Sequence, residues 1–131
     1  IVATEQSLYY HDESKGISFA GTADVIAIDD CGDPVIVDYK TGAGIYPEHA
    51  LQMAAYSLGL WYCSIGNFMS VDTLNNVRAF ILRLPKEEGL KPEIKEVNNL
   101  VGQQESFLHA VKLKQWQSDR GKWKRSKSRG N

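Results

Sequence analysis

The chain is poor in cysteine and has no long hydrophobic run. Its 131 residues include two cysteines, Cys31 and Cys63. Two thiols are too few for a disulfide framework, a four-cysteine zinc site or an iron–sulfur cluster held by cysteine alone. No apolar stretch reaches the length of about 18 residues that indicates a transmembrane helix. We therefore expect a protein of a reducing compartment that does not enter the membrane.

Sequence motifs of several enzyme classes are also missing. There is no G-x-S-x-G motif, which excludes the nucleophile elbow of the α/β-hydrolases. The turn at Gly42 and Gly44 does not continue as a dinucleotide-binding loop, because Pro47 occupies the position of its last glycine. No G-K-[ST] phosphate loop or helicase motif is present. Acyl transfer and nucleotide-driven chemistry are therefore poorly supported.

The composition is that of one globular domain, with 43% hydrophobic and 24% charged residues. The formal net charge of −1 hides an asymmetry. Residues 110–131 carry a net charge of +7, and residues 1–109 a net charge of −8. We expect a domain over residues 1–117, followed by a basic tail over residues 118–131. Because cations neutralise phosphates and indoles stack on bases, this tail suits a polyanion, although a solvated terminus would have the same composition.

Hydrophobic periodicity predicts an α+β fold built on one mixed sheet of about five strands flanked by helices. The expected order is strand-strand-strand-helix-strand-strand-helix. Strands are predicted at residues 4–10, 17–28, 35–40, 77–84 and 93–97, the first three of them antiparallel. Helices are predicted from Pro47 to about residue 65 and over residues 101–116.

The hairpin over residues 17–40 brings two carboxylates together. A three-residue loop with Gly32 at positive φ pairs Asp29 with Asp33, and the same register places Asp24 opposite Asp38. Like charges that face each other destabilise a sheet unless a cation neutralises them. Lys40 shares a face with Asp38, whereas the other face of the same strand is expected to pack against a helix; it carries Val35, Val37 and Tyr39. Two carboxylates and an ammonium group suit metal-dependent phosphodiester hydrolysis, because Mg²⁺ prefers carboxylate oxygens and activates water.

The first predicted helix adds a stripe of polar side chains. His49, Gln52 and Tyr56 lie at positions i, i+3 and i+7, so they share one side of the helix. Gln52 can bind a phosphate or a base edge, and Tyr56 offers a hydroxyl and a stacking surface. The alternative is an ordinary helix surface with Tyr56 half inside the core. With the hairpin as a neighbour, we expect these residues to point toward the carboxylates.

Three segments in this order resemble the motifs of the RecB-like branch of the PD-(D/E)XK nucleases. Residues 21–24 (GTAD) resemble its G-x-x-D motif, residues 38–40 (DYK) its D-x-K motif, and residues 52–56 (QMAAY) its Q-x-x-x-Y motif. Each motif is weak alone, but the set and its spacing are specific. The resemblance implies a restriction-endonuclease-like fold and a Mg²⁺- or Mn²⁺-dependent DNA nuclease. The implied reaction is hydrolysis by a metal-activated water, leaving 5′-phosphate and 3′-hydroxyl ends.

The resemblance also implies roles for single residues. Asp24, Asp38 and Lys40 correspond to catalytic positions, with Asp24, Asp38 and the Tyr39 carbonyl as metal ligands. Glu5 resembles an extra acidic ligand of some members. Gln52 and Tyr56 correspond to groups that position the substrate. From the helix stripe and the charge of the tail, we expect His49 and cations of the tail to contact DNA as well. These cations are Lys122, Lys124 and Arg125.

Several expectations concern the wider context. The resemblance implies DNA as a partner, either single-stranded or at duplex ends, and a place in a larger recombination or replication assembly. It favours the cytoplasm of a bacterial or phage-infected cell, with a mitochondrial location as the alternative. Members usually begin with a helix that this sequence does not contain. A nuclease-fold module that binds nucleic acid or a protein without cutting is therefore the alternative function, and a metal-binding interaction domain is a third.

Overall fold

The computed structural model describes residues 2–42, 44–45, 47–64, 70–86 and 88–129, with side chains in the last helix described as far as Asp119. Five strands form one mixed sheet in the order β1-β2-β3-β4-β5. They are β1 (Ala3–Asp12), β2 (Ile17–Ile28), β3 (Pro34–Lys40), β4 (Arg78–Arg83) and β5 (Glu93–Glu96). The helices are α1 (Pro47–Ser64), α2 (Val71–Asn75) and α3 (Leu100–Arg129). The sheet is antiparallel except for the β3–β4 pair, which is parallel.

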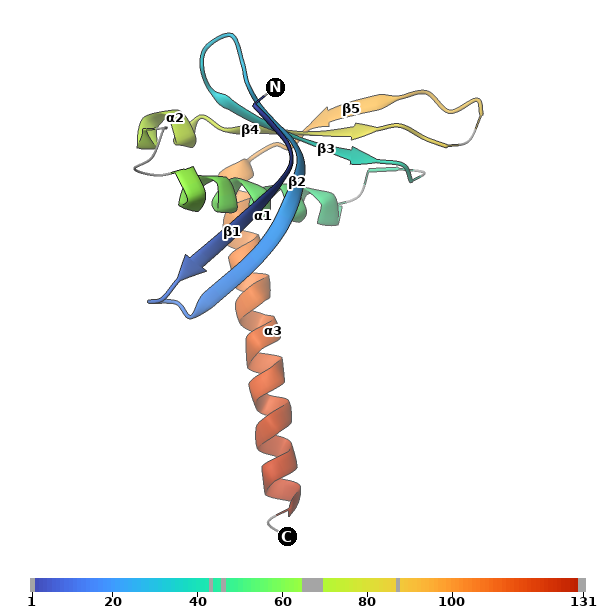
Figure 1. Cartoon of the computed structure of the whole chain (residues 1–131). Helices are drawn as coiled ribbons and strands as arrows, with labels where there is room; N and C mark the ends of the chain where they lie inside the picture. Colours follow the sequence, from blue (N-terminus) through green and yellow to red (C-terminus); the bar gives the residue numbers. More distant parts are fainter. Residues whose placement is uncertain (1, 43, 46, 65–69, 87, 130–131) are drawn as a thin grey trace.

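The expected fold class is confirmed, with two differences in the helices. The short helix α2 was not predicted, because five residues capped by the Ser70 side chain contain no readable periodicity. Helix α3 continues to Arg129 instead of ending near Trp116. Its second half is strongly polar, so the sequence has no apolar stripe there that would predict a helix. As Figure 1 shows, this half extends away from the sheet and carries the C-terminus with it.

The core lies between the sheet and α1. Its buried side chains include Ile36 and Ile81 from the two central strands and Met53 from α1, none more than 2% exposed. Helix α3 packs mainly against α1, where Gln104 Nε2 donates a hydrogen bond to Ser57 Oγ at 2.8 Å. Figure 1 shows α1 crossing beneath the strands, with α3 running from its side. Helix α1 thereby lies close enough to β3 for Lys40 Nζ to donate a hydrogen bond to Gln52 Oε1 at 2.6 Å.

The expectation that a helix covers Val35, Val37 and Tyr39 is wrong. Helix α1 packs on the other face of β3, the face of Ile36 and Asp38. Tyr39 is 47% exposed. The sequence misleads here because β3 is apolar on both faces, and the polar residues Asp38 and Lys40 suggested that their face was the exposed one. The buried face instead ends in a polar cluster.

No described helix is both long and apolar enough to cross a membrane.

Candidate active site

The turn between β2 and β3 sets the register that the sequence predicts. Gly32 has φ +85°, and Asp29 Oδ1 accepts hydrogen bonds from the backbone N–H groups of Cys31 and Asp33, both at 2.9 Å. Pairing then runs from Ile28–Pro34 to Val25–Val37. One step further along the same register come Asp24 and Asp38. The loop chemistry thus determines which carboxylates meet.

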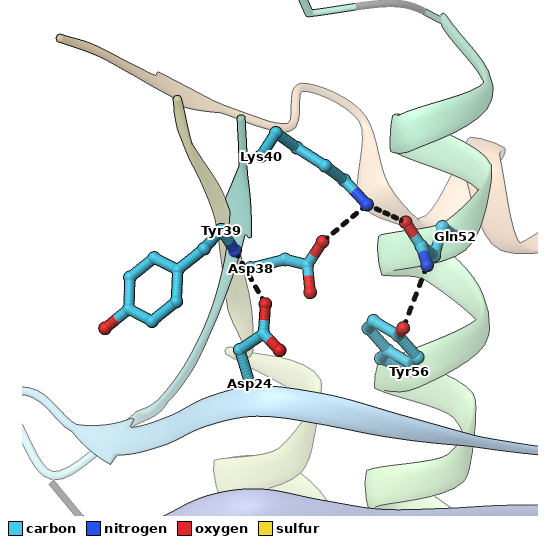
Figure 2. Close-up of polar contacts among 6 residues, drawn as sticks. All are labelled: Asp24, Asp38, Tyr39, Lys40, Gln52 and Tyr56. Atoms are coloured by element: carbon cyan, nitrogen blue, oxygen red, sulfur yellow. Dashed lines mark hydrogen bonds and ion pairs between the residues drawn. The ribbon is translucent and has the colours of Figure 1, made fainter. Parts of the chain in front are cut away.

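Asp24 and Asp38 converge above the end of the hairpin. Asp24 Oδ2 accepts a hydrogen bond from the Tyr39 backbone N–H at 2.8 Å, so the Asp24 side chain reaches across to β3 (Figure 2). Asp38 is 3% exposed. Burial raises its pKa to about 6, with a further rise from its hydrogen bond with Asp24, while Lys40 opposes both effects. The two carboxylates therefore form one site in which a second negative charge is costly.

Lys40 connects this site to α1. Its Nζ lies 2.8 Å from Asp38 Oδ2 and donates a hydrogen bond to Gln52 Oε1 at 2.6 Å. Gln52 Nε2 in turn donates to the Tyr56 hydroxyl at 2.9 Å. Figure 2 shows this continuous chain of polar contacts running from β3 to the helix. Burial, followed by the negative charge of Asp38, raises the pKa of Tyr56, so the phenol keeps its proton at neutral pH.

The position of α1 depends on close packing with the β1–β2 hairpin. Gln52 and Tyr56 are four residues apart, so they lie one above the other on the helix. The Tyr56 ring rests against Gly21, where an added Cβ would lie 3.0 Å from Tyr56 Cε1. One turn further, a Cβ at Gly59 would lie 2.9 Å from Leu8 Cβ. Two glycines, one on each element, therefore allow the helix to bring Gln52 and Tyr56 to Lys40.

The donor set fits a divalent cation. Among the described residues, the partner of buried Asp38 Oδ2 is the Lys40 ammonium group, which forms an ion pair with it at 2.8 Å. A buried carboxylate beside a second carboxylate, with one ammonium group to balance the two charges, is the environment that a hard cation stabilises. The described part of the chain contains no group of three or more His, Cys, Asp or Glu side chains placed for a metal. Two carboxylates are nevertheless sufficient for Mg²⁺, which keeps several of its waters.

The structure does not bring every expected residue into this cluster. Glu5 is exposed on β1 with φ +48°, at a break in the β1–β2 pairing, and belongs to no three-ligand group of described residues. The Tyr39 side chain points away from the carboxylates (Figure 2), which leaves only its backbone near them. His49 is half-buried on α1 and lines a neighbouring pocket with Gln52. The side chains of Lys122, Lys124 and Arg125 lie outside the described part of the structure.

One charged residue near the site was not anticipated. Arg83 is 9% exposed and pairs with Lys40 in the β3–β4 register. Its Nε lies 3.7 Å from Glu93 Oε1, and neither Nε nor Nη1 has a hydrogen-bond partner among the described residues. The sequence does contain a signal for this position, because every second residue of β4 is buried and Ala79, Ile81 and Arg83 share that face. Arg83 thus adds a buried positive charge on the strand beside Lys40.

Comparison with known proteins identifies the family. The family model of the PD-(D/E)XK nuclease superfamily matches residues 1–127. The chain therefore belongs to the PD-(D/E)XK nuclease superfamily, whose members are usually nucleases and typically use divalent metals. Among solved structures, the crystal structure of SSO0001 is similar, with 18% sequence identity and a TM-score of 0.48, covering 82% of this chain and 50% of that one. The chain thus spans about half the length of that protein. No curated protein matches the chain.

Proposed function

We propose that the chain is a Mg²⁺- or Mn²⁺-dependent DNA exonuclease of the RecB-like branch, with Asp24, Asp38 and Lys40 as its catalytic residues. The observation that carries this proposal is the buried Asp38 carboxylate beside the half-buried carboxylate of Asp24, with the Lys40 ammonium group 2.8 Å from Asp38 Oδ2. Two carboxylates beside one ammonium group leave a negative charge that a divalent cation would neutralise. Membership of the superfamily supports nuclease chemistry at this cluster.

Each residue of the cluster would have a role that follows from its chemistry. Asp24 and Asp38 would hold the cation, which when bound supplies charge neutralisation at the phosphate and an acidic water. The Tyr39 backbone would add its carbonyl, which in an extended strand faces the same edge as the N–H bound to Asp24. Lys40 is positioned by Gln52, so its ammonium group can stabilise charge on a phosphoryl oxygen or orient a water.

Gln52 and Tyr56 position the substrate. The Tyr56 hydroxyl accepts the hydrogen bond from Gln52 and keeps its own proton. This proton is available to a phosphate oxygen, since a hydroxyl both donates and accepts. Because Gln52 contacts both Lys40 and Tyr56, a phosphate held by Tyr56 would lie beside the catalytic lysine.

Digestion of end-labelled DNA tests the proposal. Single-stranded and blunt duplex DNA are incubated with the parent chain in Mg²⁺, Mn²⁺ or EDTA, and products are resolved by size. We expect cation-dependent release of nucleotides from an end. Asp38→Asn removes the charge that holds the cation, and Lys40→Gln removes the ammonium group. Each should lower the rate by about a hundredfold or more.

Matched variants control for a general loss of charge. Asp30→Asn changes an exposed carboxylate in the hairpin turn, and Lys86→Gln changes an exposed lysine; both should cut at the parental rate. Binding of DNA without cutting by the parent, whichever cation is added, would instead identify a non-cutting nuclease-fold module. Parental activity in Asp38→Asn or Lys40→Gln would place the chemistry elsewhere.

A further inference from the structure

A pocket of about 610 Å³ opens beside the candidate active site, between the β1–β2 hairpin, α1 and α3. Gln52 and Tyr56 form part of its wall, and they are the same side chains that connect to Lys40. The pocket and the carboxylate cluster therefore share two residues. A molecule whose phosphate lies at Asp38 and Lys40 would place its attached group at the mouth of this pocket.

The lining of the pocket is mostly apolar and partly aromatic. Phe19 from β2 and Phe107 from α3 meet edge to face, with ring centroids 4.8 Å apart. Tyr10 also stacks on Phe19, with centroids 5.1 Å apart. Both phenylalanines are half-buried, so packing fixes their positions while part of each ring stays accessible. Such rings are preorganised to stack with a planar group.

These features select an unpaired nucleobase as the occupant. Stacking on aromatic side chains is the usual means by which proteins hold single-stranded nucleic acid without reading its sequence. The volume falls in the range of small-molecule sites, so a base or a nucleoside fits and a duplex does not. A base in a duplex could enter only after unpairing and unstacking, which costs a few kcal/mol.

We infer that this pocket binds the unstacked base of a DNA strand next to the phosphate held at Asp38 and Lys40, so that the substrate is single-stranded DNA or a frayed end. The inference rests on the proposed function for the location of the phosphate. It goes further in naming the strand state of the substrate and the place of the base. Because stacking on Phe19 and Phe107 does not distinguish one base from another, preference among the four bases should be weak.

Filling the pocket tests the inference. Ala110 lines the pocket from α3 and is exposed, so Ala110→Trp adds a ring to the pocket without disturbing the core. Ser106→Trp is the matched control, because Ser106 is exposed on the same helix and does not line the pocket. Circular dichroism during heating verifies that both variants fold. Binding of a labelled oligothymidylate and of a blunt duplex is measured by anisotropy in EDTA, where nothing is cut.

We expect Ala110→Trp to weaken binding of the single strand by about tenfold, the contribution of one stacked base, and to leave duplex binding unchanged. Ser106→Trp should bind both as the parent does. A series of oligonucleotides carries one abasic residue at successive positions along the strand. The parent should bind one of them with the same tenfold loss of affinity, and Ala110→Trp should show no further loss with any of them. Equal weakening for single strand and duplex, or none for either, would overturn the inference.

The outcomes also separate this inference from the proposed nuclease. Selective loss of single-strand binding in a chain that cuts no DNA would keep the base pocket and reject the nuclease. If the parent cuts DNA only with metal, and the Ala110→Trp variant cuts and binds both substrates as the parent does, the nuclease is kept and the base pocket is rejected. If the parent dimerises and Ala110→Trp is a monomer by light scattering, a second copy fills the pocket and the inference is wrong.

Discussion

Asp38 is the residue in which burial, charge and function are most directly opposed. Its folded-state pKa of about 6 lies well above the ordinary value of 3.8. The folded chain therefore holds this proton to a higher pH than the unfolded chain does. We predict that, without metal, this residue makes the free energy of unfolding fall as pH rises from about 4 to about 6, by up to about 3 kcal/mol, and level off above.

Urea unfolding of the parent and of Asp38→Asn at several pH values measures this contribution. Asparagine keeps the shape but cannot ionise, so the difference in unfolding free energy between the two proteins should change across that pH window and be constant above it. A difference independent of pH would mean that Asp38 titrates normally. The same ionisation would be needed for a cation to bind, so the stability lost between about pH 4 and about pH 6 is the cost of a site ready for metal.

At this scale, the sequence predicted what local chemistry determines and missed what packing determines. The Asp29 turn and Gly32 specify the register, so Asp24 and Asp38 could be paired in advance. The contact between Lys40 and Gln52 does not follow from local sequence, because it depends on where α1 lies over the sheet. Arg83 was not found because its burial depends on β4 being central, which a six-residue segment does not reveal.

At the scale of elements, the site is a contact between β3 and α1 that the β1–β2 hairpin holds in place. The helix approaches closely because Gly59 has no side chain at the point where Leu8 crosses it. The sequence showed a helix here and a hairpin earlier, but it did not show which face of β3 the helix would cover. Alternation cannot decide that question when both faces of a strand are apolar, as with Val35, Ile36 and Val37.

Gly59→Ala tests this close approach. Alanine favours a helix over glycine by about 1 kcal/mol, but its Cβ would lie 2.9 Å from Leu8 Cβ, and such overpacking costs about 1–3 kcal/mol. We therefore expect a net loss of about 1 kcal/mol in unfolding free energy, measured by urea denaturation. Gly42→Ala is the control, because a Cβ there meets nothing within 4 Å. A more stable Gly59→Ala protein would show that α1 can move off the hairpin at little cost.

The whole molecule combines an acidic body with a basic end. Helix α3 joins the two, and the contacts that hold it to the body extend from Gln104 to Gln115. Gln104 bonds α1, Phe107 packs on Phe19, and Gln115 Nε2 donates to the Gly16 carbonyl at 2.9 Å. Residues 118–129 follow these contacts along the part of α3 that leaves the sheet (Figure 1). The charge of this segment is read directly from the sequence, whereas its polarity conceals that it is helical.

Ending the chain after Gln117 should separate electrostatic capture from folding. The change removes six of the fifteen Lys and Arg residues but keeps the hydrogen bonds that hold α3 to the body. Each phosphate of a single strand that is no longer neutralised lowers the slope of log affinity against log salt by about 0.7. We therefore expect the dependence of log affinity on log salt to become shallower, its negative slope shrinking in magnitude by up to about four, and thermal stability to stay the same. Anisotropy titrations from low to high salt measure the slope.

A full-length variant with those six cations replaced by glutamine identifies the cause. If charge alone holds the strand, its slope should match that of the shortened chain, and both proteins should approach the parent's affinity at high salt, where the phosphate contacts contribute little. An unchanged slope in both would show that the basic end does not touch DNA. Because the pocket beside Tyr56 is apolar, its share of the affinity should survive at high salt, so single-strand preference should then be greatest in all three proteins.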